Sequence, residues 1–230
     1  METFIYSHLD LHVHIALFHD VSNSADIRKR IIAAATLKGE EGDAERERVN
    51  FAFVDARLVT SLLHFQTAIY QAILSEKQGA LRTKTVHSEI LFALNPSNNI
   101  TEAIRRYGVS DTTSSLLVVR VASPDLSDVE GKMREVVKGG IEPLSALEKD
   151  TDWAAVKKYH KLNTEPAIKE AGKDVARERP RLYKADHIVA YHTPHCSLPT
   201  CSESYFVSCQ VEVSSMARGR WVFALLVCIQ

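Results

Sequence analysis

Short apolar runs of strand length alternate along this chain with longer segments that have the periodicity of amphipathic helices. In residues 11–18, apolar side chains recur at every second position, which is typical of a strand with one face on a core. Residues 50–55, 89–94 and 116–121 form further short apolar runs. Strands that alternate with helices predict an α/β fold, in which helices pack on one mixed β-sheet in a single domain.

The segments between these runs carry helix signals. Asn23 or Ser24 supplies an N-cap for a helix that we expect to end near Gly39, in a charged loop over residues 38–48. A second, longer helix follows the run at 50–55. Its amphipathic stripe has spacings of three and four and consists of Leu58, Leu62, Phe65, Ile69 and Ile73.

Later helices are predicted from caps and breakers. Asn99 precedes a helical segment, and Glu102 lies three residues after Asn99, which resembles a capping box. Gly108 stands where a left-handed residue commonly ends a helix. Two shorter helices are expected over residues 129–137 and 151–159.

The composition divides the chain into a domain and a tail. Residues 1–176 have the patterning of a folded domain, whereas residues 177–230 form an atypical tail rich in serine and cysteine, which we expect to be poorly ordered. All four cysteines lie in this tail, and their irregular spacing favours free thiols over a zinc site with His195. The longest apolar run, residues 221–229, is shorter than the roughly 20 residues that span a bilayer. We therefore expect a soluble protein of the nucleus and cytoplasm, without a membrane partner.

Motifs of catalysis are absent from the sequence. The glycines form neither a phosphate-binding loop nor the G-x-S-x-G elbow, and residues 1–195 contain no cysteine nucleophile. We predict no catalytic residue, no cofactor and no metal. An alternative is a small metal-dependent enzyme in which His12 and His14 bind zinc, completed by His8, His19 or Asp20. The competing interpretation places both histidines on the solvent-facing side of a half-exposed strand.

Basic residues suggest a local contact with RNA. Lysine and arginine number 28 against 29 aspartates and glutamates, so the net charge does not attract nucleic acid. Clusters at residues 28–30, 82–84, 105–106 and 157–161 could surround an RNA strand if the fold gathers them, with Tyr107 and Tyr159 stacking on bases. The alternative is that each cluster is a solvated helix face.

The stretch from residue 84 to residue 109 is long and specific, and it reads KTVHSEILFALNPSNNITEAIRRYGV. It resembles the family of PRPK-binding proteins (TPRKB), a small subunit of the KEOPS, or EKC, complex. LFHDVSNS at residues 17–24 and VKKYHKL at residues 156–162 support the likeness. The resemblance implies a non-catalytic α/β subunit that binds the N-lobe of the complex's small atypical kinase/ATPase and promotes its activity. The complex makes threonylcarbamoyladenosine on tRNA through a separate transferase subunit, and some members of the family also capture the tRNA 3′ end.

From this resemblance we expect partner contacts along the helix at residues 100–108 and on the exposed side of residues 58–73. The predicted partner-binding residues are Ile100, Ala103, Ile104, Tyr107 and Gly108. The predicted RNA-binding residues are Lys84, Arg105 and Arg106. The family's amphipathic C-terminal helix has no match in residues 172–180, which hold too few apolar positions and a proline. A stand-alone RNA-binding module remains the other alternative.

Overall fold

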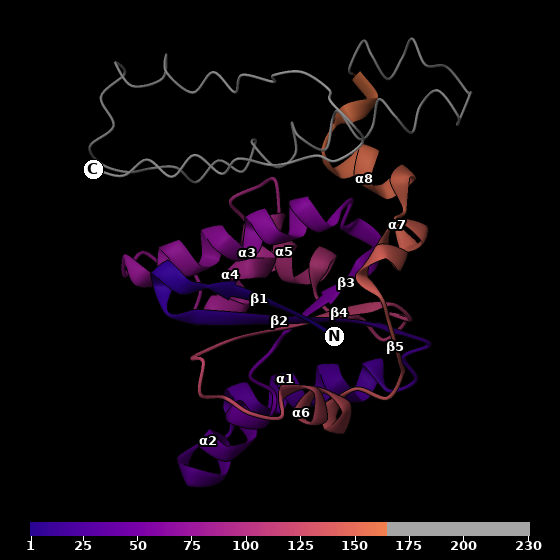
Figure 1. Cartoon of the computed structure of the whole chain (residues 1–230). Coiled ribbons are helices and arrows are strands. Elements are labelled where there is room, and N and C mark those ends of the chain that lie inside the picture. Colours follow the sequence, from indigo (N-terminus) through magenta and orange to yellow (C-terminus); the bar gives the residue numbers. More distant parts are fainter. Residues whose placement is uncertain (165–230) are drawn as a thin grey trace, which may run out of the picture. The chain divides into compact units, whose positions relative to one another are not determined.

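A five-stranded β-sheet with helices on both faces forms the part of the chain that the structure describes, residues 1–164 of a computed structural model (Figure 1). The strands run in the order β1-β2-β4-β3, and β5 pairs with β2. Every pairing among the described strands is antiparallel, so the predicted mixed sheet is wrong in this respect, while the α/β class is confirmed. The strands are β1 (Glu2–Tyr6), β2 (Leu11–His19), β3 (Ala52–Asp55), β4 (Leu116–Ala122) and β5 (Gly140–Glu142).

Strand β2 is central because both of its faces are apolar. Val13, Ile15 and Leu17 lie on one face, whereas Ala16 and Phe18 lie on the other, and all five are buried. The prediction of a strand with one exposed face is therefore wrong: helices cover both sides. A sheet sandwiched between two helical layers must bury alternate residues in opposite directions, which is why period-two alternation weakens along this strand.

The upper helical layer packs on the Val13 face of the sheet (Figure 1). Its long helix begins after Ser61, whose Oγ accepts a hydrogen bond from the amide of His64 at 3.1 Å. Leu58, which we expected within that helix, lies instead in a short 3-10 segment before it. The helices of this layer are α3 (Leu62–Lys77), α4 (Val86–Leu94), α5 (Ile100–Tyr107), α7 (Leu147–Asp150) and α8 (Trp153–Tyr159).

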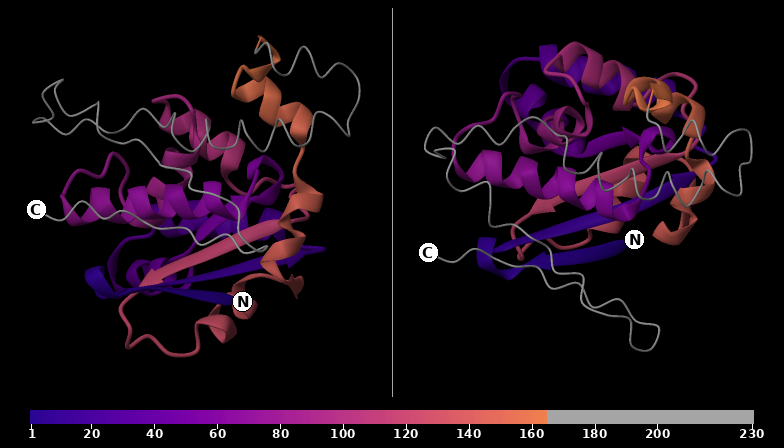
Figure 2. Two further views of the ribbon diagram at one scale, coloured as in Figure 1. Left: turned by 45° about the horizontal axis from the view of Figure 1, so that its top comes forward. Right: turned by 90° about the horizontal axis from the view of Figure 1, so that it is seen from above.

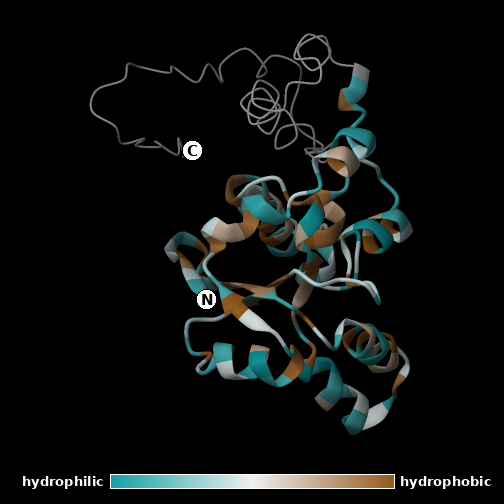
Figure 3. Ribbon diagram, turned by 90° about the vertical axis from the view of Figure 1, so that its right-hand side faces the viewer, coloured by the Kyte–Doolittle hydropathy of each residue, from teal (hydrophilic) through white to brown (hydrophobic). Residues whose placement is uncertain are grey.

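The lower helical layer packs on the Phe18 face of the sheet, and it consists of α1 (Ser24–Thr36), α2 (Gly39–Arg48) and α6 (Val129–Val136). Figure 2 shows both layers from two further directions. Figure 3 shows that the lower helices turn mainly hydrophilic residues outward, while hydrophobic residues gather along the sheet. Ile27 and Met133 are fully buried between this layer and the sheet.

Two expected elements have a different structure. Residues 89–94, predicted as a strand, belong to helix α4, which starts from a capping box between Thr85 and Ser88. Because α4 is buried on almost every side, its sequence is apolar all round and shows no helical period. Residues 38–48, predicted as a charged loop, form helix α2, in which Gly42 alone is buried. Strands β1 and β5 were not predicted at all.

Several expectations fall on residues outside the described part. These are the tail at residues 177–230 with its four cysteines, expected to be free thiols rather than zinc ligands with His195, and the segment at residues 172–180. Among the helices of residues 1–164, none is long and apolar enough to cross a membrane. The described residues belong to one structural unit.

Candidate partner-binding site

Helix α5 carries an exposed apolar pair. Ile100 is 37% exposed and Ile104 is 52% exposed, and they lie one turn apart on the outer side of the helix. Arg105 is exposed beside them. Apolar anchors with a polar rim are what a protein-binding surface needs. The exposed face of Ile100, Ile104 and Arg105 is called the α5 face below.

The start of α5 is held by a network of polar side chains. Asn99 Oδ1 accepts a hydrogen bond from the amide of Glu102 at 3.1 Å, so the predicted N-cap is present. The Glu102 carboxylate does not complete a capping box. It accepts a hydrogen bond from Ser97 Oγ at 2.7 Å, which lowers its pKa, and it pairs with Arg106. Buried Asn95 donates to the carbonyl of Ser97 at 2.9 Å and so fixes the turn before the helix.

The inner side of α5 belongs to the core. Ala103 and Tyr107 are fully buried, and the Tyr107 hydroxyl lies 3.2 Å from Nε2 of His160, just after α8. Burial raises the pKa of Tyr107, so its hydroxyl remains protonated. Ala103 and Tyr107, which we predicted to contact a partner, therefore lie in the core of this structure, and the Tyr107 ring is covered.

Gly108 is also buried, and it ends the helix in an unexpected way. Its φ of −76° is extended rather than left-handed, because the chain passes directly into a bridge with Val54 of β3. A Cβ at this position would lie 2.4 Å from the carbonyl oxygen of Ile104. A close approach to backbone, rather than a positive φ, requires glycine here. Of the five predicted partner-binding residues, Ile100 and Ile104 remain at the surface.

Two of the three predicted RNA-binding residues are exposed, and the third is largely covered. Lys84 and Arg105 are exposed, on the segment before α4 and in the last turn of α5. Arg106 is largely covered: its guanidinium pairs with Glu102 and lies 4.2 Å from the ring centroid of Tyr159. A cation over an aromatic face is attracted to it, so Arg106 joins α5 to α8.

The comparison with known proteins decides the family. Residues 18–184 match the model of a family described as kinase binding protein CGI-121. The chain belongs to the CGI-121 family. The match extends past residue 176, where we predicted the domain to end, and it includes the whole α5 face.

Relatives in this family have names that agree with the predicted resemblance. An EKC/KEOPS complex subunit CGI121 from Cryptococcus neoformans is 35% identical over 209 residues, which covers 74% of this chain and 91% of that protein. The corresponding subunit from Aspergillus fumigatus is 36% identical, with 71% and 85% covered. The subunit from Yarrowia lipolytica is 31% identical, with 68% and 83% covered.

In this CGI-121 family member, a contact that we did not predict joins buried His64 on α3 to half-buried His160 at the end of α8. The rings of His64 and His160 have centroids 6.4 Å apart and meet edge to face. Thr60 Oγ1 lies 3.0 Å from His64 Nδ1, and burial lowers the pKa of His64 to about 4. His64 occupies a position inside an apolar helical stripe, which is the only signal in the sequence that it is buried.

The exposed side of residues 58–73 contributes less than we expected. Leu63, in the first turn of α3, is 44% exposed, while Phe65, Ile69 and Ile73 are buried. Leu58 is buried as well. Figure 2 shows α3, α5 and α8 on the same side of the sheet, so Leu63 and the α5 face belong to one helical layer.

The histidines of the alternative zinc site lie in three different places. His14 is buried on β2, its Nδ1 is 2.9 Å from Thr3 Oγ1, and its pKa is lowered by burial and then by His12 and Arg120. His8 contacts Tyr70 instead, at 3.4 Å. His19 Nε2 lies 3.0 Å from Asp150. The competing interpretation placed His14 on the solvent-facing side of the strand, but this residue is buried. Within residues 1–164, no three His, Cys, Asp or Glu side chains are grouped to hold a metal ion.

Proposed function

We propose that this chain is a non-catalytic subunit of an EKC/KEOPS complex that binds the small atypical kinase/ATPase of that complex and promotes its activity. The observation that carries the proposal is the family match over residues 18–184, together with relatives named as EKC/KEOPS subunits. Those relatives align along most of their own length, so the whole fold is shared rather than one motif. A subunit of this kind acts by presenting a surface.

The α5 face is the surface that we propose for the kinase. Ile100 and Ile104 are held at fixed positions because the opposite side of α5 is anchored in the core by Ala103 and Tyr107. A helix that is fixed before binding loses little conformational entropy when its partner docks. The pair with Glu102 and the contact with Tyr159 remove Arg106 from the rim, so Ile100 and Ile104 supply the kinase contact while Arg105 stays at its edge.

The kinase contact is tested by placing a charge in the centre of the α5 face. Ile104→Arg should weaken binding to the purified kinase subunit by at least about tenfold, because burying an unpaired guanidinium in an interface is costly. Isothermal titration calorimetry measures this directly. Ile32→Arg is the matched control: Ile32 is 56% exposed on α1, in the other helical layer, and its replacement should leave the affinity unchanged.

We further propose that the chain helps to recruit tRNA for threonylcarbamoyladenosine formation by a separate transferase subunit. Exposed Lys84 and Arg105 supply the phosphate contacts in this proposal. Replacing both with methionine should weaken tRNA binding by the assembled complex and make its logarithmic salt dependence less steep by about 2, one for each lost phosphate contact. Arg134→Met is the control, since Arg134 is exposed but pairs with Glu130 on α6.

The same experiments separate this proposal from a stand-alone RNA-binding module. A chain that binds tRNA tightly without any protein, and that shows no heat of binding with the kinase, would support the module and contradict the subunit. Intact kinase binding by Ile104→Arg would leave the subunit proposal in place but remove the α5 face from it.

A further inference from the structure

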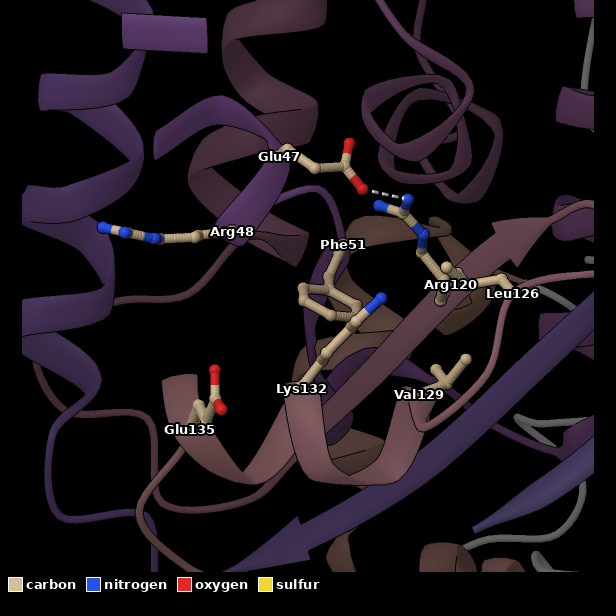
Figure 4. A pocket seen from close by; sticks show the side chains of 8 residues that line it. All are labelled: Glu47, Arg48, Phe51, Arg120, Leu126, Val129, Lys132 and Glu135. Atoms are coloured by element: carbon tan, nitrogen blue, oxygen red, sulfur yellow. Dashed lines mark hydrogen bonds and ion pairs between the residues drawn. The ribbon is translucent and has the colours of Figure 1, made fainter. Parts of the chain in front are cut away.

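A small cavity lies on the lower side of the sheet, away from the α5 face. It opens between the C-terminal end of α2, the end of β4 and the first turns of α6, and its volume is about 160 Å³ (Figure 4). Neither the kinase contact nor the tRNA contact proposed above uses these residues.

The cavity has an apolar floor. Phe51 is 7% exposed and Val129 is 4% exposed, and Leu126 completes the lining beside them. An apolar cavity of about 150 Å³ in another protein holds a molecule of benzene. The floor and the volume therefore suit one flat, six-membered ring, and they are too small for a nucleoside.

The wall of the cavity is cationic and preorganised. Arg120 reaches down from β4, and its guanidinium donates to the backbone carbonyl of Asn50 and, at 2.6 Å, to the Glu47 carboxylate. The same guanidinium lies 5.7 Å from the ring centroid of Phe51. Its side chain is 10% exposed, and its Nε has no hydrogen-bond partner among the described residues. A cation beside an aromatic face is attracted to it, so the contact with Phe51 helps to hold the Arg120 guanidinium in place.

The mouth of the cavity carries one ammonium group, whose positive charge helps to lower the pKa of Glu47. Lys132 projects from α6 toward Phe51 in Figure 4, and it forms no ion pair among the described residues. The other charges are engaged or distant: Glu47 is paired with Arg120, Arg48 lies 3.6 Å from Glu45, and Glu135 stands at the far end of the cavity from Arg120. The lining residues carry three basic and two acidic groups, so a ligand with a single negative charge balances them.

We propose that this cavity binds a small aromatic monoanion, a single flat ring that bears one carboxylate. The ring lies on Phe51 between Leu126 and Val129, and the carboxylate accepts hydrogen bonds from the Lys132 ammonium at the mouth. The Arg120 guanidinium flanks the ring and is kept in place by Glu47 and Asn50. The ring thus leaves water while its charge stays at the solvent boundary, which avoids the cost of burying an unpaired carboxylate.

Benzoate titrated into the full-length chain tests this proposal by amide chemical-shift changes in two-dimensional NMR. Saturable shifts should centre on residues 47–51 and 126–132. Benzyl alcohol, which keeps the ring and lacks the charge, should bind at least about fivefold more weakly, as expected for the loss of a charge-assisted hydrogen bond. Lys132→Met should weaken benzoate binding by a similar factor and leave the binding of benzyl alcohol unchanged.

Lys138→Met is the matched control, since Lys138 is exposed just after α6 and does not line the cavity. Its affinity for benzoate should equal that of the unmodified chain. Absence of saturable shifts at tens of millimolar benzoate would overturn the proposal. Equal binding of benzoate and benzyl alcohol, or equal benzoate binding by Lys132→Met and Lys138→Met, would overturn it too. All these variants change exposed residues, so folding does not complicate the comparison.

Discussion

The two helical layers cover opposite faces of one sheet, and helix α2 of the lower layer is attached by different forces from the helices of the upper layer. In the upper layer, α3 and α4 bury apolar side chains along most of their length. In the lower layer, α1 buries Ile27 and α6 buries Val129, Met133 and Val136, whereas α2 buries Gly42 alone. The hydrophobic effect thus holds the upper layer together with α1 and α6, at roughly 1.5–3 kcal/mol for each large side chain fully buried, and α2 is the exception.

Arginine contacts hold α2 in place of apolar packing. Arg30 pairs with Glu45 at 2.8 Å, and Arg46 donates to the carbonyl oxygens of Ala34 and Leu37 at the end of α1. Arg120 joins the helix to the sheet through Glu47. Hydrogen bonds and partly exposed ion pairs each contribute about 1 kcal/mol or less. The difference teaches that the layer with the α5 face is a rigid support, while α2 is an attachment that can be weakened without unfolding the sheet.

The largest effect should come from removing apolar volume in the upper layer. Ile69, on α3, is fully buried, and Ile69→Ala should lower the free energy of unfolding by about 3 kcal/mol through lost burial and a residual cavity. Ile32→Ala, at an exposed position on α1, should cost less than about 0.5 kcal/mol. Urea unfolding of both variants measures the contrast. Similar losses for the two would contradict the burial of Ile69 and the exposure of Ile32.

The same contrast explains which elements the sequence predicts. Helix α3 has one exposed and one buried side, so its helical period is visible in the sequence. Helix α4 is buried on nearly every side and α2 is exposed on nearly every side. Because neither helix has one apolar and one polar side, neither sequence shows a helical period. Strand β5 pairs with β2, which lies far away in the sequence, so no local pattern contains that pairing. Strand β1 pairs with the neighbouring β2 across a short connection, and none of its residues is fully buried.

For the site, the sequence located the helix and its N-cap but not its orientation. Ile100, Ala103, Ile104 and Tyr107 have spacings of three and four and form one stripe. Ala103 and Tyr107 define the edge that is buried, and Ile100 with Ile104 define the edge that is exposed. The sheet and α8 decide which edge turns inward, and their positions are tertiary information. The contact of Arg106 with Tyr159 was invisible for the same reason.

Acid should weaken the upper layer next. Burial lowers the pKa of His64 to about 4 and that of His87 to about 3, both below the pKa of about 6.5 in the unfolded chain. The unfolded state therefore binds protons at pH values where these histidines stay neutral in the folded state, and the free energy of unfolding falls as the pH drops below 6.5. Between pH 7 and pH 5 each histidine should cost about 2 kcal/mol.

Urea unfolding at the two pH values checks this expectation. His87→Gln should reduce the pH-dependent loss by about 2 kcal/mol, whatever its own cost at pH 7, where His87 Nε2 accepts a hydrogen bond from the amide of Val121. A variant with the same pH slope as the unmodified chain would mean that His87 is protonated when folded, or exposed to solvent.

A smaller effect is expected from removing the Arg120 contacts that join β4 to α2. Arg120→Met removes two charge-assisted hydrogen bonds and should lower the free energy of unfolding by about 1.5 kcal/mol. Amide hydrogen exchange should accelerate in α2 and stay unchanged in α3. Arg28→Met, which breaks an exposed pair with Asp111, should cost less than about 0.5 kcal/mol. Accelerated exchange in both layers would contradict the separate attachment of α2.

The smallest global effect, and the sharpest local one, should come from Gly42→Ala. A Cβ on Gly42 would lie 2.5 Å from the carbonyl oxygen of Leu37, a backbone atom at the end of α1, so α2 has to move away from α1. Alanine also favours the helix itself by about 1 kcal/mol over glycine, so α2 should remain helical while it detaches. Since few apolar groups hold α2, the free energy of unfolding should change by less than about 1 kcal/mol. Hydrogen exchange should nevertheless rise across residues 37–48, whereas Gly140→Ala, where nothing lies within 4 Å of the added Cβ, should change neither quantity. A loss above about 3 kcal/mol would mean that α2 is part of the cooperative core and not a separately attached helix.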